Sequence, residues 1–416
     1  MTALNLASLK VKDVVTFAKG KPPAAQPYFG KDAEVYLTPE YLRGGVGTEP
    51  IKAHKNAARV RSGETIVLWD GSNAGEVFKA KAGVLSSTMV ELQPDDSFTA
   101  DYFYYAMKGW EGYLKGQTSG SGIPHVDKEV IGKLDLLAFS KPEQSKIAEI
   151  LATVDQAIEQ TEALIAKQQR IKTGLMQDLL TRAIDELGQL RTEQTHAFKD
   201  SPLGRIPVEW GVQTLESVSE FVTSGSRGWA QYYATEGALF LRIGNLTRKH
   251  INMRFDDVIR VSPPASSEGE RTAVKKDDLL ISITADLGIV AVIPDGFETA
   301  YVNQHIALTR LDHSRANARF VWWFLNGQLG QAQFDKLNES GAKAGLNLPS
   351  IKNLQIPVPP LDEQVKIAQA IDAATKKTDE FHARLIKCQS LKRALMQDLL
   401  TGRKRVVDLL LAEVAA

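Results

Sequence analysis

The stretch Leu175-Met176-Gln177-Asp178-Leu179-Leu180-Thr181 recurs unchanged as residues 395–401. Upstream of it, EQSKIA at residues 143–148 recurs as EQVKIA at residues 363–368. Both pairs share one offset of 220 residues without a gap. Two gapless matches at one offset indicate that the chain contains two copies of one long element.

Each copy predicts a long helix with an apolar seam. Residues at steps of four and three, from 147 to 168 and again from 367 to 388, form heptad seams of the kind that pairs helices. Pro142 precedes the first run and Pro359 and Pro360 precede the second, as expected where a chain enters a helix. We expect spacer helices over residues 142–182 and 362–405, each roughly 60 Å long at about 1.5 Å per residue. The apolar seam residues expected to pair are Ile147, Leu151, Val154, Ile158, Ile165, Ile367, Ile371, Phe381 and Leu385.

Three interpretations of the seams stay open: an ordinary bundle core, a homodimeric coiled coil, and an antiparallel pair formed by the two copies within one chain. Repetition within one chain favours the third. Polar or small residues interrupt the seams and indicate a pair of moderate stability; they are Thr161, Gln168, Ala374 and Thr378.

Ahead of each helix lies a segment long enough for an α+β domain. Residues 66–68 and 279–281 are short apolar runs between turn residues, typical of buried strands. Aromatic residues at helical spacing within 101–114 and 318–329 predict core-facing helices. We therefore expect globular domains over residues 1–141 and 213–361, joined through a connector over residues 183–212 that docks against the second domain.

Composition restricts the function classes. The 416 residues include 50 basic and 50 acidic side chains, so a nucleic-acid surface requires local segregation of charge. The single cysteine, Cys388, excludes an internal disulfide and a cysteine-rich zinc site. The start of the chain lacks the apolar core of a signal peptide, and no run is long enough to span a membrane. We expect a cytoplasmic protein.

The motifs of common enzymes are missing from the sequence. It contains no glycine-rich nucleotide loop, no Gly-x-Ser-x-Gly, no His-Glu-x-x-His and no Asn-Pro-Pro-Tyr/Phe of adenine methyltransferases. A binding protein is favoured over an enzyme with an unfamiliar site. A coiled-coil scaffold that does not bind DNA is the alternative.

The repeated motifs resemble Type I restriction-modification specificity subunits. The resemblance rests on residues 356–364 (IPVPPLDEQ), 395–401 and 204–210 (GRIPVEW), and it covers essentially the whole chain. The first helix start departs from the pattern, with AFSKP at residues 138–142 in place of a proline pair.

This resemblance implies two target-recognition domains, each reading half of a split double-stranded DNA site, held apart by an antiparallel coiled coil with pseudo-two-fold symmetry. It also implies two methyltransferase (modification) subunits as partners, possibly with restriction (translocase/nuclease) subunits in phage defence. Adenine-N6 methylation and cleavage would belong to those partners, which would bind S-adenosylmethionine, ATP and Mg. This chain would hold no cofactor, no metal and no catalytic residue.

The residues expected at DNA come from locally basic or flexible polar segments. The first domain contributes a basic cluster and a polar loop: Lys52, His54, Lys55, Arg59, Arg61, Gln117 and Ser119. The second contributes comparable groups: Arg227, Arg242, Asn245, Arg248, Lys249, Lys343 and Asn347.

Overall fold

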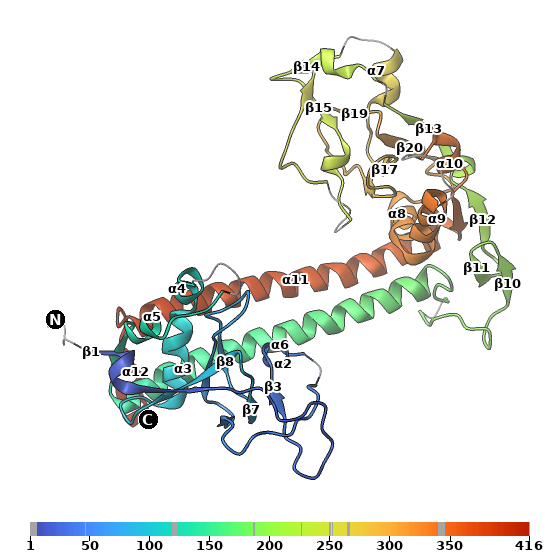
Figure 1. Ribbon diagram of the computed structural model, residues 1–416. Helices are drawn as coiled ribbons and strands as arrows, with labels where there is room; N and C mark the ends of the chain where they lie inside the picture. The colour runs from blue at the N-terminus through green and yellow to red at the C-terminus, as the bar shows by residue number, and fades with distance from the viewer. Residues whose placement is uncertain are drawn as a thin grey trace. The chain divides into compact units, whose positions relative to one another are not determined.

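The computed structural model describes residues 6–45, 47–118, 124–185, 188–225, 227–248, 251, 253–263, 267–339 and 346–415. The chain divides into two compact units, Met1–Ala163 with His382–Ala416, and Leu164–Phe381 (Figure 1). We call these unit 1 and unit 2. The long helices α6 (Lys141–Leu179) and α11 (Leu361–Leu400) each contribute one half to each unit. Within the described residues, no helix is long and apolar enough to cross a membrane.

Unit 1 builds its globular part from short strands and helices. Its strands are β1 (Ala7–Lys10), β2 (Val15–Lys19), β3 (Tyr36–Leu37), β4 (Arg59–Val60), β5 (Thr65–Leu68), β6 (Val77–Lys79), β7 (Gly83–Leu85), β8 (Met89–Pro94) and β9 (Asp135–Ala138). Its shorter helices are α1 (Val11–Val14), α2 (Pro39–Leu42), α3 (Ala100–Gly109), α4 (Glu111–Gly116), α5 (Lys128–Gly132) and the C-terminal α12 (Val407–Ala415).

The central sheet of unit 1 is antiparallel, in the order β2-β8-β5-β6, and a smaller sheet has the order β3-β7-β4. Both faces of the central sheet are buried. Val67 and Val90 face Phe103 of α3, whereas the alternating residues Ile66 and Met89 face the smaller sheet. Because successive side chains of a strand point to opposite faces, neighbouring residues enter two different cores. This explains the unbroken apolar runs in the sequence.

Unit 2 repeats this plan. Its strands are β10 (Phe198–Ser201), β11 (Gly204–Pro207), β12 (Gly211–Thr214), β13 (Ser219–Ser224), β14 (Tyr233–Ala234), β15 (Ala238–Leu241), β16 (Arg260–Val261), β17 (Leu279–Ser282), β18 (Val290–Val292), β19 (Ala300–Val302), β20 (Ile306–Leu311) and β21 (Gln355–Val358). Its shorter helices are α7 (Ser267–Thr272), α8 (Ala318–Asn326), α9 (Gln328–Glu339), α10 (Leu348–Lys352) and three 3-10 turns, η1 (Glu216–Val218), η2 (Trp229–Tyr232) and η3 (Ile243–Asn245).

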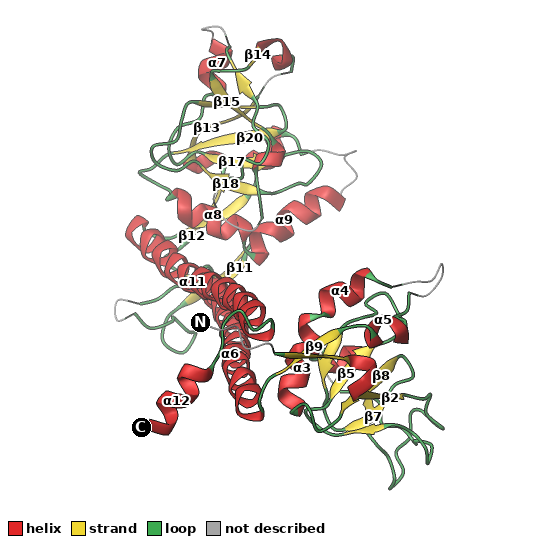
Figure 2. Ribbon diagram, turned by 90° about the vertical axis from the view of Figure 1, so that its left-hand side faces the viewer, coloured by secondary structure: helices red, strands yellow, loops and turns green. Residues whose placement is uncertain are grey.

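The central sheet of unit 2 has the order β13-β20-β17-β18, the counterpart of the central sheet in unit 1. Leu279 and Ile281 pack against the aromatic side of α8, and Leu280 between them packs against the second sheet, β14-β16-β15-β19. Strands β17 and β18 lie between α8 on one side and β15 on the other (Figure 2). The predicted α+β domains, their buried strands and their aromatic helices are confirmed. The connector also packs as predicted, because Trp210 is fully buried in the core of unit 2.

Both long helices end a few residues before the predicted limits of 182 and 405. A left-handed residue follows each end: Ala183 with φ 57° and Gly402 with φ 70°. A left-handed residue terminates a helix because it turns the chain away from the helical path. Helix α6 continues through Gly174 without a break.

The seam positions lie on the buried side of each helix. All nine apolar seam residues are buried or half-buried. The polar Thr161 and Thr378 are also buried, and each donates its hydroxyl proton to a carbonyl one turn earlier in its own helix, at 2.6 and 3.0 Å. The hydroxyl groups of Thr161 and Thr378 are therefore hydrogen-bonded within their own helices.

Contacts inside each unit show that the helices run antiparallel. In unit 1 the first half of α6 meets the last part of α11, and Asp155 pairs with Lys392 at 2.5 Å. In unit 2 Lys172 of α6 lies near Asp372 and Asp379 of α11; burial lowers the pKa of this lysine, and the two carboxylates oppose that shift. The predicted antiparallel pairing is confirmed within each unit.

The repeated Glu-Gln pair fastens each helix start to its domain. The amide nitrogen of the fully buried Gln144 donates to the carbonyls of Ser97 and Phe139 at 2.8 and 2.9 Å, and its oxygen accepts from the backbone N–H of Thr99 at 2.7 Å. Gln364 makes the equivalent three bonds in unit 2. Each glutamine therefore ties the start of its long helix to the segment that precedes α3 or α8.

The glutamate of each pair binds an arginine from the segment that follows the other long helix. Glu143 accepts from Arg405 at 2.6 Å, and Glu363 lies 3.0 Å from Arg191. Burial raises the pKa of Glu363, although Arg191 opposes that shift. Arg405, part of the basic run at the end of α11, therefore has a structural partner.

Candidate nucleic-acid interface

Three loops meet at one edge of the central sheet in unit 1. Strand β2 ends at Lys19, opposite Val90 near the start of β8, and β5 ends at Leu68, opposite Met89. The loops after β2 and β5 and the loop before β8 therefore converge. Lys19 and Asp70 form an ion pair at 3.2 Å across this edge, and Ser86 shares a hydrogen bond of 3.0 Å with Thr88.

Unit 2 has the same edge with different side chains. Strand β13 ends at Ser224, opposite Ala307 of β20, and β17 ends at Ser282, opposite Ile306. The residues that occupy this edge are Gly225, Arg227, Thr284, Asn303, Gln304 and His305.

The glycine that follows β2 in unit 1 and β13 in unit 2 lets the loops of each edge approach closely. A β-carbon on Gly20 would overlap the backbone of Ser86, and one on Gly225 would overlap the backbone of Asn303. Ser86 and Asn303 are both buried. The two units thus share a backbone frame that presents different polar side chains.

Acidic residues distant in sequence neutralise part of the basic cluster predicted in the first domain. Arg59 donates two hydrogen bonds to Glu34, at 2.7 and 2.8 Å, and Lys52 lies 3.8 Å from Asp32. The other described candidates of this domain are exposed: His54, Lys55, Arg61 and Gln117. Ser119 lies outside the described residues.

Several candidates of the second domain hold the fold together. Asn245 is buried, accepts from the backbone N–H of Arg242 at 2.9 Å and donates to two carbonyls. Arg242 pairs with Asp257 at 2.7 Å, and Arg248 pairs with Asp286 at the same distance.

Asn347 caps α10 by accepting from the backbone N–H of Ser350 at 2.8 Å. Arg227 is exposed, and no described residue accepts a hydrogen bond from its guanidinium or pairs with it. Lys249 and Lys343 lie outside the described residues. Contact with DNA stays a prediction for all fourteen candidates.

Sequence reasoning missed the polar residues at the sheet edge of unit 2. Thr284, Gln304 and His305 lie beside Arg227, although 57 residues separate Arg227 from Thr284 in the sequence. The sequence signal for this edge is a glycine after β2 or β13 together with a polar tripeptide before β8 or β20. The tripeptides are residues 86–88 (SST) and 303–305 (NQH).

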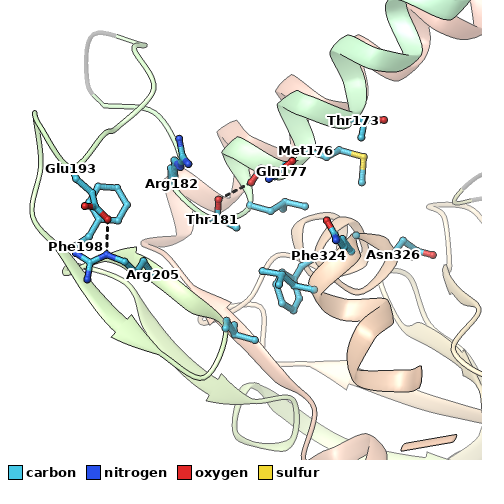
Figure 3. A pocket seen from close by; sticks show the side chains of 15 residues that line it. Thr173, Met176, Gln177, Thr181, Arg182, Glu193, Phe198, Arg205, Phe324 and Asn326 are labelled. Atoms are coloured by element: carbon cyan, nitrogen blue, oxygen red, sulfur yellow. Dashed lines mark hydrogen bonds and ion pairs between the residues drawn. The ribbon is translucent and has the colours of Figure 1, made fainter. Parts of the chain in front are cut away.

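A repeated pocket lies where the LMQDLLT motif meets its own unit. In unit 2 a cavity of about 650 Å³ has Met176 and Gln177 of α6 on one side and Phe324 and Asn326 of α8 across from them (Figure 3). In unit 1 the equivalent cavity, of about 870 Å³, lies between the second copy of the motif and helix α3. The walls from the motif in that second cavity are Met396, Gln397, Leu400 and Thr401.

The central sheet of unit 1 contains a carboxyl group whose pKa is raised. Glu91 is almost completely buried, and burial together with the neighbouring Glu64 raises the pKa of its carboxyl to about 7. Gln93 donates a hydrogen bond to it at 2.9 Å. Within the described residues, no group of three or more histidine, cysteine or acidic side chains has the arrangement of a metal site.

Comparison with known proteins supports a role in DNA recognition. Residues 5–168 and 207–388 each match the family described as Type I restriction modification DNA specificity domain. The chain is 28% identical over 412 residues to the MjaVIII specificity subunit of Methanocaldococcus jannaschii, covering 96% of this chain and 93% of that protein. It is 20% identical over 347 residues to the EcoBI specificity subunit of Escherichia coli, covering 81% and 72%.

A solved structure shares the fold across nearly the whole chain. The S subunit of a Type I restriction-modification system from M. genitalium superposes with a TM-score of 0.60 at 16% identity, covering 96% of this chain and 97% of that one. The two matched segments each contain one sheet domain and the start of the long helix that follows it. The chain therefore belongs to the family of Type I restriction-modification specificity subunits, which recognise DNA sequence.

Proposed function

We propose that this chain reads a bipartite double-stranded DNA site, with one half-site for each sheet domain. The observation that carries the proposal is the shared frame of the two sheet edges: equivalent strands and equivalent close glycines present different side chains. A common frame favours a common docking mode on DNA. Different side chains at its edge favour different bases in the two half-sites.

The proposed partners are two copies of one adenine-N6 methyltransferase subunit. The exposed Gln177 and Gln397 are identical in the two copies although neither belongs to a core. Each sits at a pocket beside a half-buried methionine, Met176 or Met396. Two like surfaces on one chain suit two copies of one partner, whereas the diverged sheet edges do not.

Catalysis is assigned to the partners. S-adenosylmethionine would bind the modification subunits, and ATP and Mg would bind restriction subunits where the complex includes them. The chain itself would direct both activities in the cytoplasm by positioning them on the recognised site.

The test is methylome sequencing of the host, with and without this gene, followed by complementation. We expect a split motif methylated on adenine to disappear on deletion and to return with the intact gene. An unchanged methylome in a strain that expresses the chain and its methyltransferase would refute the proposal in favour of the scaffold alternative. Methyl transfer by the purified chain alone would refute the assignment of catalysis to partners.

The partner surface has its own test. A Gln177→Arg variant should bind one modification subunit per chain instead of two, and native mass spectrometry of the purified complex measures this ratio. Gln169→Arg, on an exposed position of the same helix away from the pocket, is the matched control. Two copies bound to the Gln177→Arg variant would show that the pocket is not the docking surface.

A further inference from the structure

An open depression of about 690 Å³ lies at the sheet edge of unit 2. Six of the described residues line it: Ser224, Gly225, Arg227, Thr284, Gln304 and His305. None of the six is acidic, although the whole chain has as many acidic as basic residues. The lining offers an amide, an imidazole, hydroxyls and a guanidinium, so it suits a polar ligand with hydrogen-bonding edges and nearby negative charge.

Three hydrogen bonds hold His305, two at its imidazole and one at its backbone. Its Nδ1 lies 3.0 Å from the hydroxyl of Thr284, its Nε2 lies 3.1 Å from the amide nitrogen of Gln304, and its backbone N–H donates to the buried Asn303 at 3.1 Å. With its amide nitrogen towards the ring, Gln304 donates to Nε2, and Nδ1 shares a hydrogen bond with the Thr284 hydroxyl. His305 therefore fixes the orientation of the Gln304 amide.

A fixed amide of this kind retains a donor and an acceptor side by side. One N–H of Gln304 is used by His305, and no other described residue bonds its second N–H or its side-chain oxygen, which leaves both for a ligand. Adenine presents the matching pair in the major groove, an acceptor at N7 and a donor at N6, and glutamine binds it through two hydrogen bonds. We propose that Gln304 reads an adenine in the half-site of unit 2, with His305 as its positioning residue.

Two neighbours support a nucleic-acid ligand at this depression. The exposed Arg227 has no described partner and supplies positive charge at the rim. Ala285, directly after Thr284, adopts a left-handed conformation with φ 56°. A residue other than glycine rarely adopts this conformation, and backbone of this kind clusters at binding sites.

The equivalent edge of unit 1 provides an internal comparison. The tripeptide directly before β8 in unit 1 is Ser86-Ser87-Thr88. It occupies the place of Asn303-Gln304-His305, which directly precedes β20 in unit 2. A serine hydroxyl lacks the paired donor and acceptor of an amide. The adenine reading is therefore confined to unit 2, and Ser87→Ala is the matched control for Gln304→Ala.

The inference rests on the proposed function, and the experiment separates the two. The complex of the chain with its modification subunits is tested by competition binding against duplexes that carry single base changes, and by host methylomes. Gln304→Ala should weaken binding to the cognate duplex about 5- to 150-fold and abolish the requirement for adenine at one position. Gln304→Glu, nearly identical in shape, should shift preference there towards cytosine, whose N4 donates to a carboxylate.

Controls and contrary outcomes are defined by the same assay. Ser87→Ala should leave the half-site of unit 2 unchanged, and His305→Ala should relax the same adenine position as Gln304→Ala while adding little in the double variant. An unchanged base requirement in Gln304→Ala, with an intact wild-type motif, overturns this inference alone. So does uniform weakening on all duplexes with a shallower salt dependence, because that marks a phosphate contact. Absence of any motif in the wild type overturns the proposed function itself.

Discussion

The buried glutamine at the start of each long helix gives a sharp test of how helix and domain are joined. Gln144→Ala removes three hydrogen bonds, all to backbone groups, and leaves two carbonyls and one N–H without partners. A net contribution of about 1–1.5 kcal/mol per bond predicts a loss of roughly 3–4.5 kcal/mol in the free energy of unfolding. Gln364→Ala should cost the same in unit 2, where the bonds are equivalent.

The assay is urea unfolding of the purified chain, combined with hydrogen exchange. Gln144→Ala should lower the transition of unit 1 and speed exchange of the Thr99 amide, while the Asn317 amide of unit 2 keeps its protection. Gln169→Ala, on an exposed position of α6, is the control and should change stability by less than about 0.5 kcal/mol. A loss below about 1 kcal/mol for Gln144→Ala would refute the idea that this side chain locks the helix to its domain.

Three further substitutions test other parts of the fold. Glu91 has its pKa raised to about 7, so the folded state favours its protonated form. The resulting stabilisation is present below about pH 4.5 and is lost as the pH rises through 7, by at most about 3 kcal/mol. The urea midpoint of Glu91→Gln should stay constant across that pH range. Asp278→Asn breaks the buried pair with Arg310 and should cost about 3–5 kcal/mol in urea unfolding, and a loss under 1 kcal/mol would contradict a paired charge there. Gly225→Ala drives a methyl group into backbone and should lower thermal stability by about 1–3 kcal/mol, while Gly244→Ala, with open space among the described residues, should be nearly neutral.

The long helices and the buried strands could be predicted from the sequence, because repeated motifs and regular spacing of apolar residues mark them. The duplicated motifs placed both long helices within five residues of their ends, and the seam from Ile147 onward identified their buried sides. The short apolar runs of β5 and β17 were also identified, because burial on both faces leaves no polar alternation to obscure them. These features depend on local sequence, which explains their success.

The individual roles of charged and amide side chains depended on contacts that sequence proximity conceals. Arg59 stood in an acid-free cluster, yet Glu34 reaches it from 25 residues away. Asn245 and Asn347 were predicted at DNA, but both hydrogen-bond to backbone. The same donors and acceptors serve a loop or a ligand, and only the folded geometry decides between them.

Unit 1 consists of two separate segments of the chain, and this constrains the order in which the two units can fold. Unit 2 is one continuous segment, Leu164–Phe381, whereas unit 1 needs the later segment His382–Ala416 to cover its helix start and to supply Arg405. A ribosome adding about 5–20 residues per second needs roughly 10–45 s to proceed from the end of the first segment of unit 1 to the beginning of the last. During that interval Ile147 and Leu151 lack their packing partners in α11, such as Leu399. The domain encoded second can therefore be complete first, and the domain encoded first is finished only after the segment from His382 onward has been made.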